Sequence, residues 1–195
     1  MTTTSLNKVS IRLESGGHSF SGAELRAVVD GGHEAVEVVV LTPKTTLVPA
    51  DLFDAKSAAD YLVAVGLAPN NAECVVCTKP INGAVAVMAI NQECNAALHG
   101  VGFASISYAT PLLCGDAVEQ GSVLHLEGGL LYVRVYNAGL RFAEVMECQC
   151  DADMLYYLTQ INEVYNTYDM CARATGDTKS LQRVTKRLFK ELICE

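Results

Sequence analysis

Hydrophobic and polar positions alternate near the start of the chain and again in its second half. Residues 9–14 alternate Val, Ile and Leu with polar side chains, and residues 131–136 alternate Leu and Val with Tyr and Arg. A period of two is typical of a β-strand that has one buried face and one face in water. One pair of glycines follows the first region and another pair precedes the second, so the pattern predicts strands joined by tight turns.

The predicted elements occur in the same order twice, as three strands followed by an amphipathic helix. The first copy has strands at residues 9–14, 19–29 and 35–41, turns at Ser15-Gly16-Gly17 and Asp30-Gly31-Gly32, and a helix at residues 54–65. The second has strands at residues 123–127, 131–136 and 140–148, turns at Gly128-Gly129 and Asn137-Ala138-Gly139, and a helix at residues 151–164. Because three strands with a helix on one face leave half a core uncovered, each copy must pack against further elements. The repeat predicts a two-lobed α/β protein.

The remaining segments complete the two lobes. Strands are predicted at residues 73–78, 84–90, 103–108 and 169–175, a short helix at residues 91–99, and a last amphipathic helix at residues 179–192. Residues 111–121 contain two glycines and are the expected boundary, which gives domains 1–114 and 115–195. With a helix at the end of the chain, the second lobe would lack a closing strand and leave a sheet edge open to another chain.

Composition limits the classes of partner. Half of the 195 residues are hydrophobic and 18% are charged, which is enough apolar surface for a continuous core. The net charge is −8, and the basic residues concentrate near the C-terminus, so the acidic remainder opposes general binding to nucleic acid or anionic lipid. No apolar run has the length of a signal peptide or a membrane span, so we expect a cytoplasmic protein.

The eight cysteines lie within apolar segments, which favours reduced, mostly buried thiols over disulfides. Cys74 and Cys77 would face opposite sides of a strand, and neither a second such pair nor a nearby histidine completes a zinc site. Cys148 and Cys150 would share one strand face, where packing is the expected role. The sequence therefore predicts no metal site.

The duplicated βββαβα order resembles the core of the actin, sugar-kinase and heat-shock-protein superfamily of ATPases, a ribonuclease H-like fold with mixed sheets. Three phrases sharpen the likeness: Val9-Ser10-Ile11-Arg12-Leu13, Thr46-Leu47-Val48-Pro49-Ala50-Asp51-Leu52-Phe53-Asp54 and Asp153-Met154-Leu155-Tyr156-Tyr157. Together they resemble a bacterial family of unknown function that has an actin-like ATPase fold. The resemblance spans nearly the whole chain and implies no established activity.

The resemblance also implies where a nucleotide site would lie. In active members, the first hairpin of each lobe has an Asp followed by glycines. The backbone N–H groups of the glycines approach phosphate, and the Asp carboxylate orients a magnesium-bound water. The matching positions are Glu14-Ser15-Gly16-Gly17 and Glu127-Gly128-Gly129, and both replace Asp by Glu. The paired glycines of the adenosine-binding turn correspond to Thr175-Gly176-Asp177. These departures predict a degenerate nucleotide site.

Two further groups of residues are candidates for function. His18 and His125 flank the two hairpins in corresponding places, where a surface position beside a turn is the commoner role. Tyr132, Arg134 and Tyr136 share one strand face and form a candidate interface, because Tyr and Arg are enriched where proteins meet. A contact between the two lobes would give the same pattern.

The leading interpretation is a non-catalytic actin-like protein without a cofactor, which uses its scaffold to form a homodimer or to bind a protein partner. The alternative is a Mg-ATP-binding ATPase or kinase-like switch that uses the cleft between the lobes. A third interpretation is an adaptor of the pilus or cell-division type, which reuses this fold. Fold alone does not decide among them.

Overall fold

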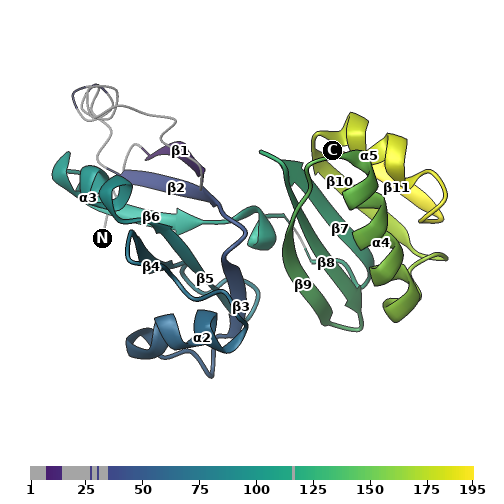
Figure 1. Ribbon diagram of the computed structural model, residues 1–195, viewed down its shortest axis with the longest axis horizontal. Coiled ribbons are helices and arrows are strands. Elements are labelled where there is room, and N and C mark those ends of the chain that lie inside the picture. The colour runs from purple at the N-terminus through teal and green to yellow at the C-terminus, as the bar shows by residue number, and fades with distance from the viewer. Residues whose placement is uncertain (1–7, 15–26, 28–29, 31–34, 116) are drawn as a thin grey trace, which may run out of the picture. The chain divides into compact units, whose positions relative to one another are not determined.

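The computed structural model describes residues 8–14, 27, 30, 35–115 and 117–195 (Figure 1). Contacts divide the chain into two compact units, Met1–Leu113 (unit 1) and Cys114–Glu195 (unit 2). Each unit has its own sheets, helices and hydrophobic core. The α/β class with mixed sheets is confirmed.

Unit 1 contains two three-stranded sheets. In the first, β1 (Lys8–Glu14), β2 (Ala35–Leu41) and β6 (Ser105–Ala109) run parallel in that order, so β2 is the central strand. In the second, β5 (Ala84–Asn91) lies between β3 (Thr45–Pro49) and β4 (Glu73–Cys77) and is antiparallel to both. Within residues 35–113, the helical segments are η1 (Ala55–Ser57), α2 (Ala58–Ala64), α3 (Gln92–Gly100) and η2 (Pro111–Leu113).

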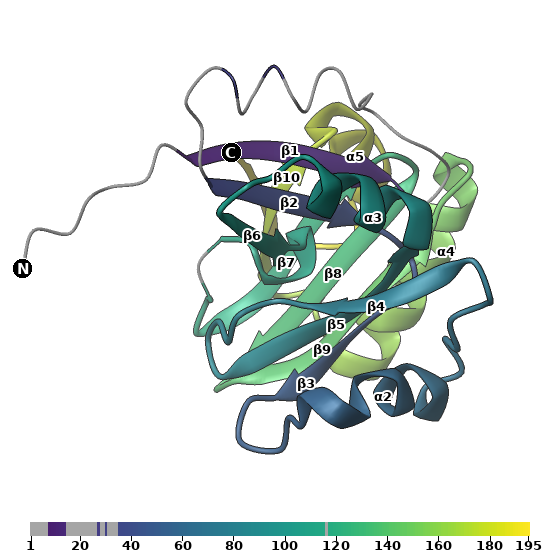
Figure 2. The ribbon, with the colours of Figure 1, turned by 90° about the vertical axis from the view of Figure 1, so that its left-hand side faces the viewer.

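The core of unit 1 has two layers separated by the antiparallel sheet (Figure 2). One face of β5 carries Met88 and Ile90, which pack with β2 and with Leu98 of α3. The other face carries Val87, which packs with Leu62 of α2. Residues 85–90 are therefore all buried, as a central strand covered on both faces requires.

The first copy of the predicted repeat is wrong in its pairing. β1 and β2 are direct parallel neighbours, with Lys8 opposite Ala35 and Glu14 opposite Leu41. No strand can therefore lie between them, although the sequence predicted one at residues 19–29. Most of that segment lies outside the described residues, and Ala27, which is described, is helical. A parallel pair needs a crossover connection, which a meander of tight turns cannot supply.

Unit 2 is a five-stranded mixed sheet with both of its helices, α4 (Asp151–Tyr165) and α5 (Thr178–Thr185), on one face (Figure 1). The strand order is β11 (Glu191–Cys194), β10 (Cys171–Gly176), β7 (Gln120–Glu127), β8 (Leu130–Asn137) and β9 (Leu140–Glu147). β7, β8 and β9 form the predicted antiparallel meander. Leu124, Leu131, Val133, Leu158 and Leu181 are fully buried where this sheet meets the helices.

The predicted last helix is too long, and the predicted open edge at its strand is wrong. α5 ends at Thr185, and β11 then pairs in parallel with β10, from Cys171 opposite Glu191 to Ala174 opposite Cys194. Leu188 and Phe189 are adjacent and both buried, which departs from the single inward stripe of an amphipathic helix. The closing strand satisfies backbone groups of β10 that would otherwise lack partners.

The other predicted elements are confirmed to within a few residues. Asp54 caps the segment before α2 by accepting a hydrogen bond from the backbone N–H of Lys56 at 3.0 Å. Asn91 caps α3 through bonds from the N–H groups of Glu93 and Cys94. These caps occupy the first free N–H groups of each helix and fix where it begins.

Candidate functional site

The β7–β8 hairpin has a two-residue turn formed by Gly128 and Gly129. Their φ angles are 59° and 74°, which is the left-handed region that a tight hairpin turn of this kind requires at both positions. The N–H of Cys148, just after β9, donates to the carbonyl of Gly129 at 2.7 Å. The predicted phosphate-loop glycines thus form a well-fixed turn at one end of the sheet.

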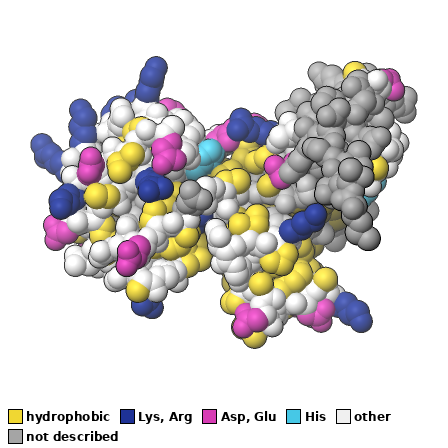
Figure 3. Space-filling view, turned by 180° about the vertical axis from the view of Figure 1, so that it is seen from behind, with side chains coloured by type: hydrophobic (Ala, Val, Ile, Leu, Met, Phe, Trp, Pro, Cys, Tyr) yellow, Lys and Arg dark blue, Asp and Glu magenta, His cyan; other side chains and the backbone are white. Residues whose placement is uncertain are grey.

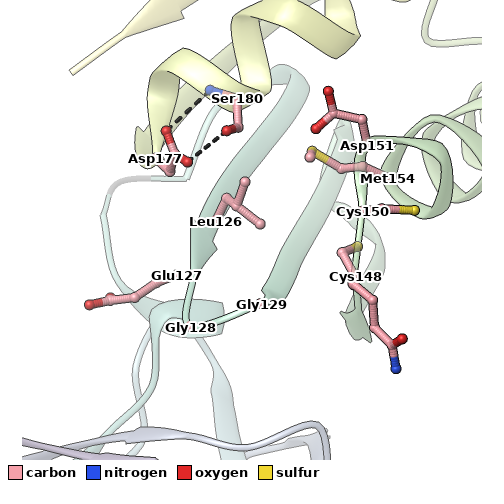
Figure 4. Close-up of a pocket in the computed structure, with 11 residues that line it drawn as sticks. Leu126, Glu127, Gly128, Gly129, Cys148, Cys150, Asp151, Met154, Asp177 and Ser180 are labelled. Carbon is pink, nitrogen blue, oxygen red and sulfur yellow. Dashed lines mark hydrogen bonds between the residues drawn. The ribbon is translucent and has the colours of Figure 1, made fainter.

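A pocket of about 210 Å³ lies beside this turn (Figure 4). Its walls come from the hairpin, from the segment after β9, and from the first residues of α4 and α5. Glu127, Gly128 and Gly129 line it together with Asp177, the neighbour of Gly176. The structure therefore brings the second-lobe candidates for a nucleotide site to one place.

The N-terminus of α5 is closed by its own capping residue. Asp177 Oδ1 accepts the N–H of Ser180 at 3.1 Å, and Asp177 Oδ2 accepts the Ser180 hydroxyl at 2.7 Å (Figure 4). These hydrogen bonds lower the pKa of Asp177 below its usual value, and the bond from the Ser180 hydroxyl has the largest effect. The carboxylate therefore stays ionised and occupies the place at which the helix could receive an anion.

The N-terminus of α4 is occupied in a similar way. Asp153 Oδ2 accepts hydrogen bonds from the N–H groups of Gln149 at 2.9 Å and Cys150 at 3.1 Å. Asp151 forms a bidentate pair with Arg183 of α5, at 2.5 Å to Nε and 2.7 Å to Nη2. The hydrogen bond from Arg183 lowers the pKa of Asp151. Two ionised carboxylates, Asp151 and Asp177, thus line the pocket.

Glu127 turns away from the other side chains of the pocket (Figure 4). Its Oε2 lies 3.0 Å from Nε2 of His125, and Nδ1 of the same ring lies 2.8 Å from the Thr175 hydroxyl on the adjacent strand. These three residues lie on the sheet face opposite the one that Leu124 and Leu126 present to the helices, since neighbours along a strand alternate. The carboxylate at the position of a magnesium-orienting Asp is therefore engaged by a histidine.

Gly176 is required by the backbone whether or not a ligand binds. Its φ is +77°, and a Cβ there would lie 2.2 Å from the carbonyl oxygen of Leu126. The N–H of Asp177 donates to the same carbonyl at 2.8 Å. Close approach of β10 to β7 thus explains this glycine without a nucleotide.

In unit 1, Glu14 is exposed at the end of β1. Ser15, Gly16 and Gly17 lie outside the described residues, as does His18. The sequence analysis assigned Asp177 to the adenosine-binding turn but did not connect Asp151 or Ser180 to this site. An Asp begins or precedes each helix, but the sequence did not indicate that both helices begin beside one hairpin.

The candidate interface of Tyr132, Arg134 and Tyr136 is buried, with exposed fractions of 2%, 2% and 6%. Nη1 of Arg134 donates to the Tyr136 hydroxyl at 3.2 Å, and Nη2 donates to the carbonyl of Cys114. The guanidinium group is therefore held by residues of its own unit. These three side chains therefore do not form an exposed docking surface.

Within the described ranges, no three His, Cys, Asp or Glu side chains are grouped as metal ligands. Cys148 is buried, but Cys150 is exposed and is the N-cap of α4, so the two do not share a strand face as predicted. Burial, with smaller contributions from the negative charges of Asp153 and Cys150, raises the pKa of Cys148 to about 11. Such a thiol is a packing group, because its reactive thiolate form is rare near neutral pH.

The arrangement of sheets and helices is that of the actin-like ATPase fold. A crystal structure from Bacteroides thetaiotaomicron VPI-5482, described as a protein with an actin-like ATPase fold and unknown function, matches with a TM-score of 0.71 and 14% identity over 96% of this chain and 90% of that one. The cytoplasmic domain of EpsL, an inner membrane component of the type II secretion system of Vibrio cholerae, matches with a TM-score of 0.49 and 12% identity over 96% and 85% of the two chains.

The model of a protein family of unknown function, DUF3822, matches residues 25–168, and the chain belongs to this family. No functionally curated protein matches the chain. Among the helices that the structure describes, none is both long and apolar enough to cross a membrane.

Proposed function

We propose that this protein is a non-catalytic member of the actin-like ATPase fold that acts as a protein-interaction or assembly module, as a homodimer or with a protein partner. The observation that carries the proposal is the pair of ionised carboxylates, Asp151 and Asp177, in the pocket beside the glycine turn. A nucleotide phosphate would have to enter where negative charge is already fixed.

The electrostatic argument rests on proximity. Like charges that lie close together repel each other, and water screens this repulsion less at a protein surface than in bulk. Phosphates carry several negative charges; Arg183 compensates the charge of Asp151, so the repulsion comes chiefly from the carboxylate of Asp177. One backbone N–H at the start of each helix is also occupied, that of Ser180 by Asp177 and that of the α4 N-cap Cys150 by Asp153.

Glu127 supports the same conclusion. A carboxylate that orients a magnesium-bound water must point toward the phosphates, but Glu127 bonds to His125 and points away from the pocket (Figure 4). Rotating Glu127 back would break its hydrogen bond with His125 and bring a third carboxylate to the pocket. We infer that unit 2 does not form the magnesium half of an ATPase site.

Thermal unfolding with and without Mg-ATP or Mg-ADP tests this proposal. A ligand at 100 times its Kd stabilises a protein by about 2.7 kcal/mol, which corresponds to a rise in Tm of roughly 5–10 °C for a chain of this size. We expect no rise at millimolar nucleotide. The matched variant Asp151→Asn/Asp177→Asn removes both charges and keeps a good cap at position 177. A small rise in this variant alone would identify the carboxylates as the barrier.

The alternative function is Mg-ATP binding by the same pocket, and the observation in its favour is the fixed Gly128-Gly129 turn on the pocket wall. A rise in Tm of the unmodified protein that disappears in Gly128→Asn would establish this alternative and overturn the proposal. Asn tolerates the left-handed backbone conformation, so it adds a side chain to the pocket at little cost to the turn.

Light scattering after size-exclusion chromatography tests association. A mass that rises with protein concentration supports a module that associates with itself. A strict monomer at high concentration leaves a protein partner and excludes the homodimer.

A further inference from the structure

The charge of the chain is strongly segregated. Residues 178–190 contain five of the 14 basic residues and none of the 22 acidic ones, so this segment is +5 and the remaining chain is −13. The segment comprises α5 and the turn that leads to β11. A charge of this sign on an otherwise acidic protein provides a surface for an acidic partner.

Four of these basic residues form an exposed surface on unit 2, which we name the basic stripe: Lys179, Lys186, Arg187 and Lys190. In Figure 3, dark blue side chains gather on unit 2, at the left of the view. None of the four forms an ion pair with another residue that the structure describes. The guanidinium group of Arg183, in contrast, is paired with the carboxylate of Asp151. The inner side of α5 is held in the core by Leu181, so the stripe is available to a partner.

Unit 1 presents a surface of opposite charge around α2. Leu52, Val63 and Val65 are exposed by 68%, 56% and 54%, which is high for large apolar side chains. Asp51, Asp54 and Asp60 are exposed on the same segment together with Lys56, which leaves an excess of negative charge. We name Asp51, Leu52, Asp60, Val63 and Val65 the α2 face; Figure 3 shows hydrophobic and acidic side chains at the bottom of the view, with a basic side chain beside them.

The stripe has an apolar neighbour as well. Leu155 lies one helical turn after Asp151, on the side of α4 from which Asp151 reaches Arg183, and it is exposed by 46%. Both surfaces thus combine exposed apolar groups with charge, positive on unit 2 and negative on unit 1. Such a combination favours a protein partner, because apolar contact provides affinity and charge provides orientation.

We propose that the basic stripe of one copy docks on the α2 face of a second copy. This inference rests on the proposed association function and names its contact. Because two different surfaces meet, the contact is heterologous, and the pair keeps one free stripe on one copy and one free α2 face on the other. Nucleic acid and anionic lipid are disfavoured, since an extended negative surface also meets the −13 remainder of the chain. At physiological salt the screening length is about 8 Å, so local pairing outweighs the repulsion between two acidic copies.

Sedimentation velocity over a range of protein concentrations tests the contact with two variants. The stripe variant is Lys186→Glu/Arg187→Glu, and the face variant is Asp51→Lys/Asp60→Lys. We expect the unmodified protein to associate. The dissociation constant of each variant should be about tenfold higher or more, because each variant places like charges together. The variants change the net charge in opposite directions, so a general charge effect would strengthen association in one of them.

Mixing the two variants gives the decisive result. The intact α2 face of the stripe variant can bind the intact stripe of the face variant, and the two reversed surfaces are also complementary, so an equimolar mixture should associate although neither variant does so alone. Arg141→Glu, an exposed reversal on β9, should leave association unchanged. Circular dichroism and Tm establish that each variant is folded.

Three outcomes would overturn the docking proposal while leaving the nucleotide result unaffected. These are a monomeric unmodified protein at every concentration, association that neither variant weakens, and variants that fail to combine when mixed. Vesicles with 30% phosphatidylserine and a duplex RNA are tested in parallel. Binding to either probe that is lost in the stripe variant, without self-association, would assign the stripe to that anionic partner instead.

Discussion

Asp177 and Ser180 are joined by two hydrogen bonds, one from the Ser180 backbone N–H at 3.1 Å and one from its hydroxyl at 2.7 Å. This pair closes the N-terminus of α5 at the wall of the pocket beside Gly128-Gly129. The same carboxylate therefore stabilises the helix and opposes anion binding. Under the proposed function, helix stability and weak phosphate binding thus have one cause at this position.

Removing the Asp177 cap should destabilise unit 2. We expect Asp177→Ala to lower the free energy of unfolding by about 1 kcal/mol and Tm by roughly 2–4 °C, because the first N–H groups of α5 lose their acceptor. Asp177→Asn should retain most of the stability, since Asn is an equally good cap. Thermal unfolding of the two variants measures the difference. An equal loss in both would mean that the negative charge, and not the cap, stabilises the helix.

Replacing Gly176 should cost more than its backbone angle alone. A Cβ at this position would lie 2.2 Å from the Leu126 carbonyl oxygen, and the φ of +77° also disfavours L-residues. Gly83 has the same φ of +77° but has no atom within 4 Å of an added Cβ. We expect Gly83→Ala to cost about 1–2 kcal/mol and Gly176→Ala clearly more, because β10 must separate from β7. Urea unfolding compares the two, and equal costs would contradict the close approach.

The sequence predicted those elements whose signals are local. The β7–β8 hairpin followed from alternation on both sides of Gly128-Gly129, and α3 begins within one residue of the predicted start at residue 91. The pairing of β1 with β2 was missed because alternation identifies a strand but does not identify its neighbour. β11 was missed because Leu181, Val184, Leu188 and Leu192 keep a helical spacing, whereas the strand forms through contact with the distant β10.

The candidate site was predictable in position but not in its chemistry. Glu127, Gly128 and Gly129 became candidates because the resemblance to the actin-like superfamily implies a phosphate loop at this hairpin. That Glu127 bonds to His125, and that Asp151 and Asp177 line the same pocket, depends on how β7, α4 and α5 are placed in space. Arg134 likewise appeared as a surface residue, because a charged side chain is rarely buried unless a specific partner such as the Cys114 carbonyl accepts it.

A pH-dependent contribution to stability is expected in unit 1, from Glu73. Burial alone would raise its pKa, but hydrogen bonds from Lys44 Nζ at 2.6 Å and from the N–H of Asn70 at 2.8 Å lower it below 4.5 overall. A carboxyl whose pKa is lower in the folded state stabilises the fold above its unfolded pKa of about 4.3, and this stabilisation is lost as pH falls through the folded pKa.

We therefore expect Glu73→Gln to cost about 1 kcal/mol at pH 7 and to match the unmodified protein more closely as pH is lowered from about 5 toward 3. Glu147→Gln, at the exposed end of β9, is the matched control and should show little effect across this range. Chemical unfolding at several pH values measures both. A cost for Glu73→Gln that stays constant down to pH 3 would show that packing, and not the charged pair with Lys44, is responsible.

Cys148 and Cys150 should differ sharply in reactivity although they are two residues apart. With a pKa of about 11, Cys148 is thiolate in roughly one molecule in 1000 at pH 8, and it is also buried. Cys150 is exposed at the start of α4. We expect iodoacetamide to label Cys150 in the folded protein within a time that leaves Cys148 unmodified, as read by mass spectrometry of peptides. Labelling in denaturant should be equal, and Cys150→Ser removes the competing thiol. Rapid labelling of Cys148 in the folded Cys150→Ser protein would mean that the end of β9 opens readily. The pocket wall beside Gly129 would then not be fixed, and the proposal that this pocket excludes phosphate would lose its structural basis.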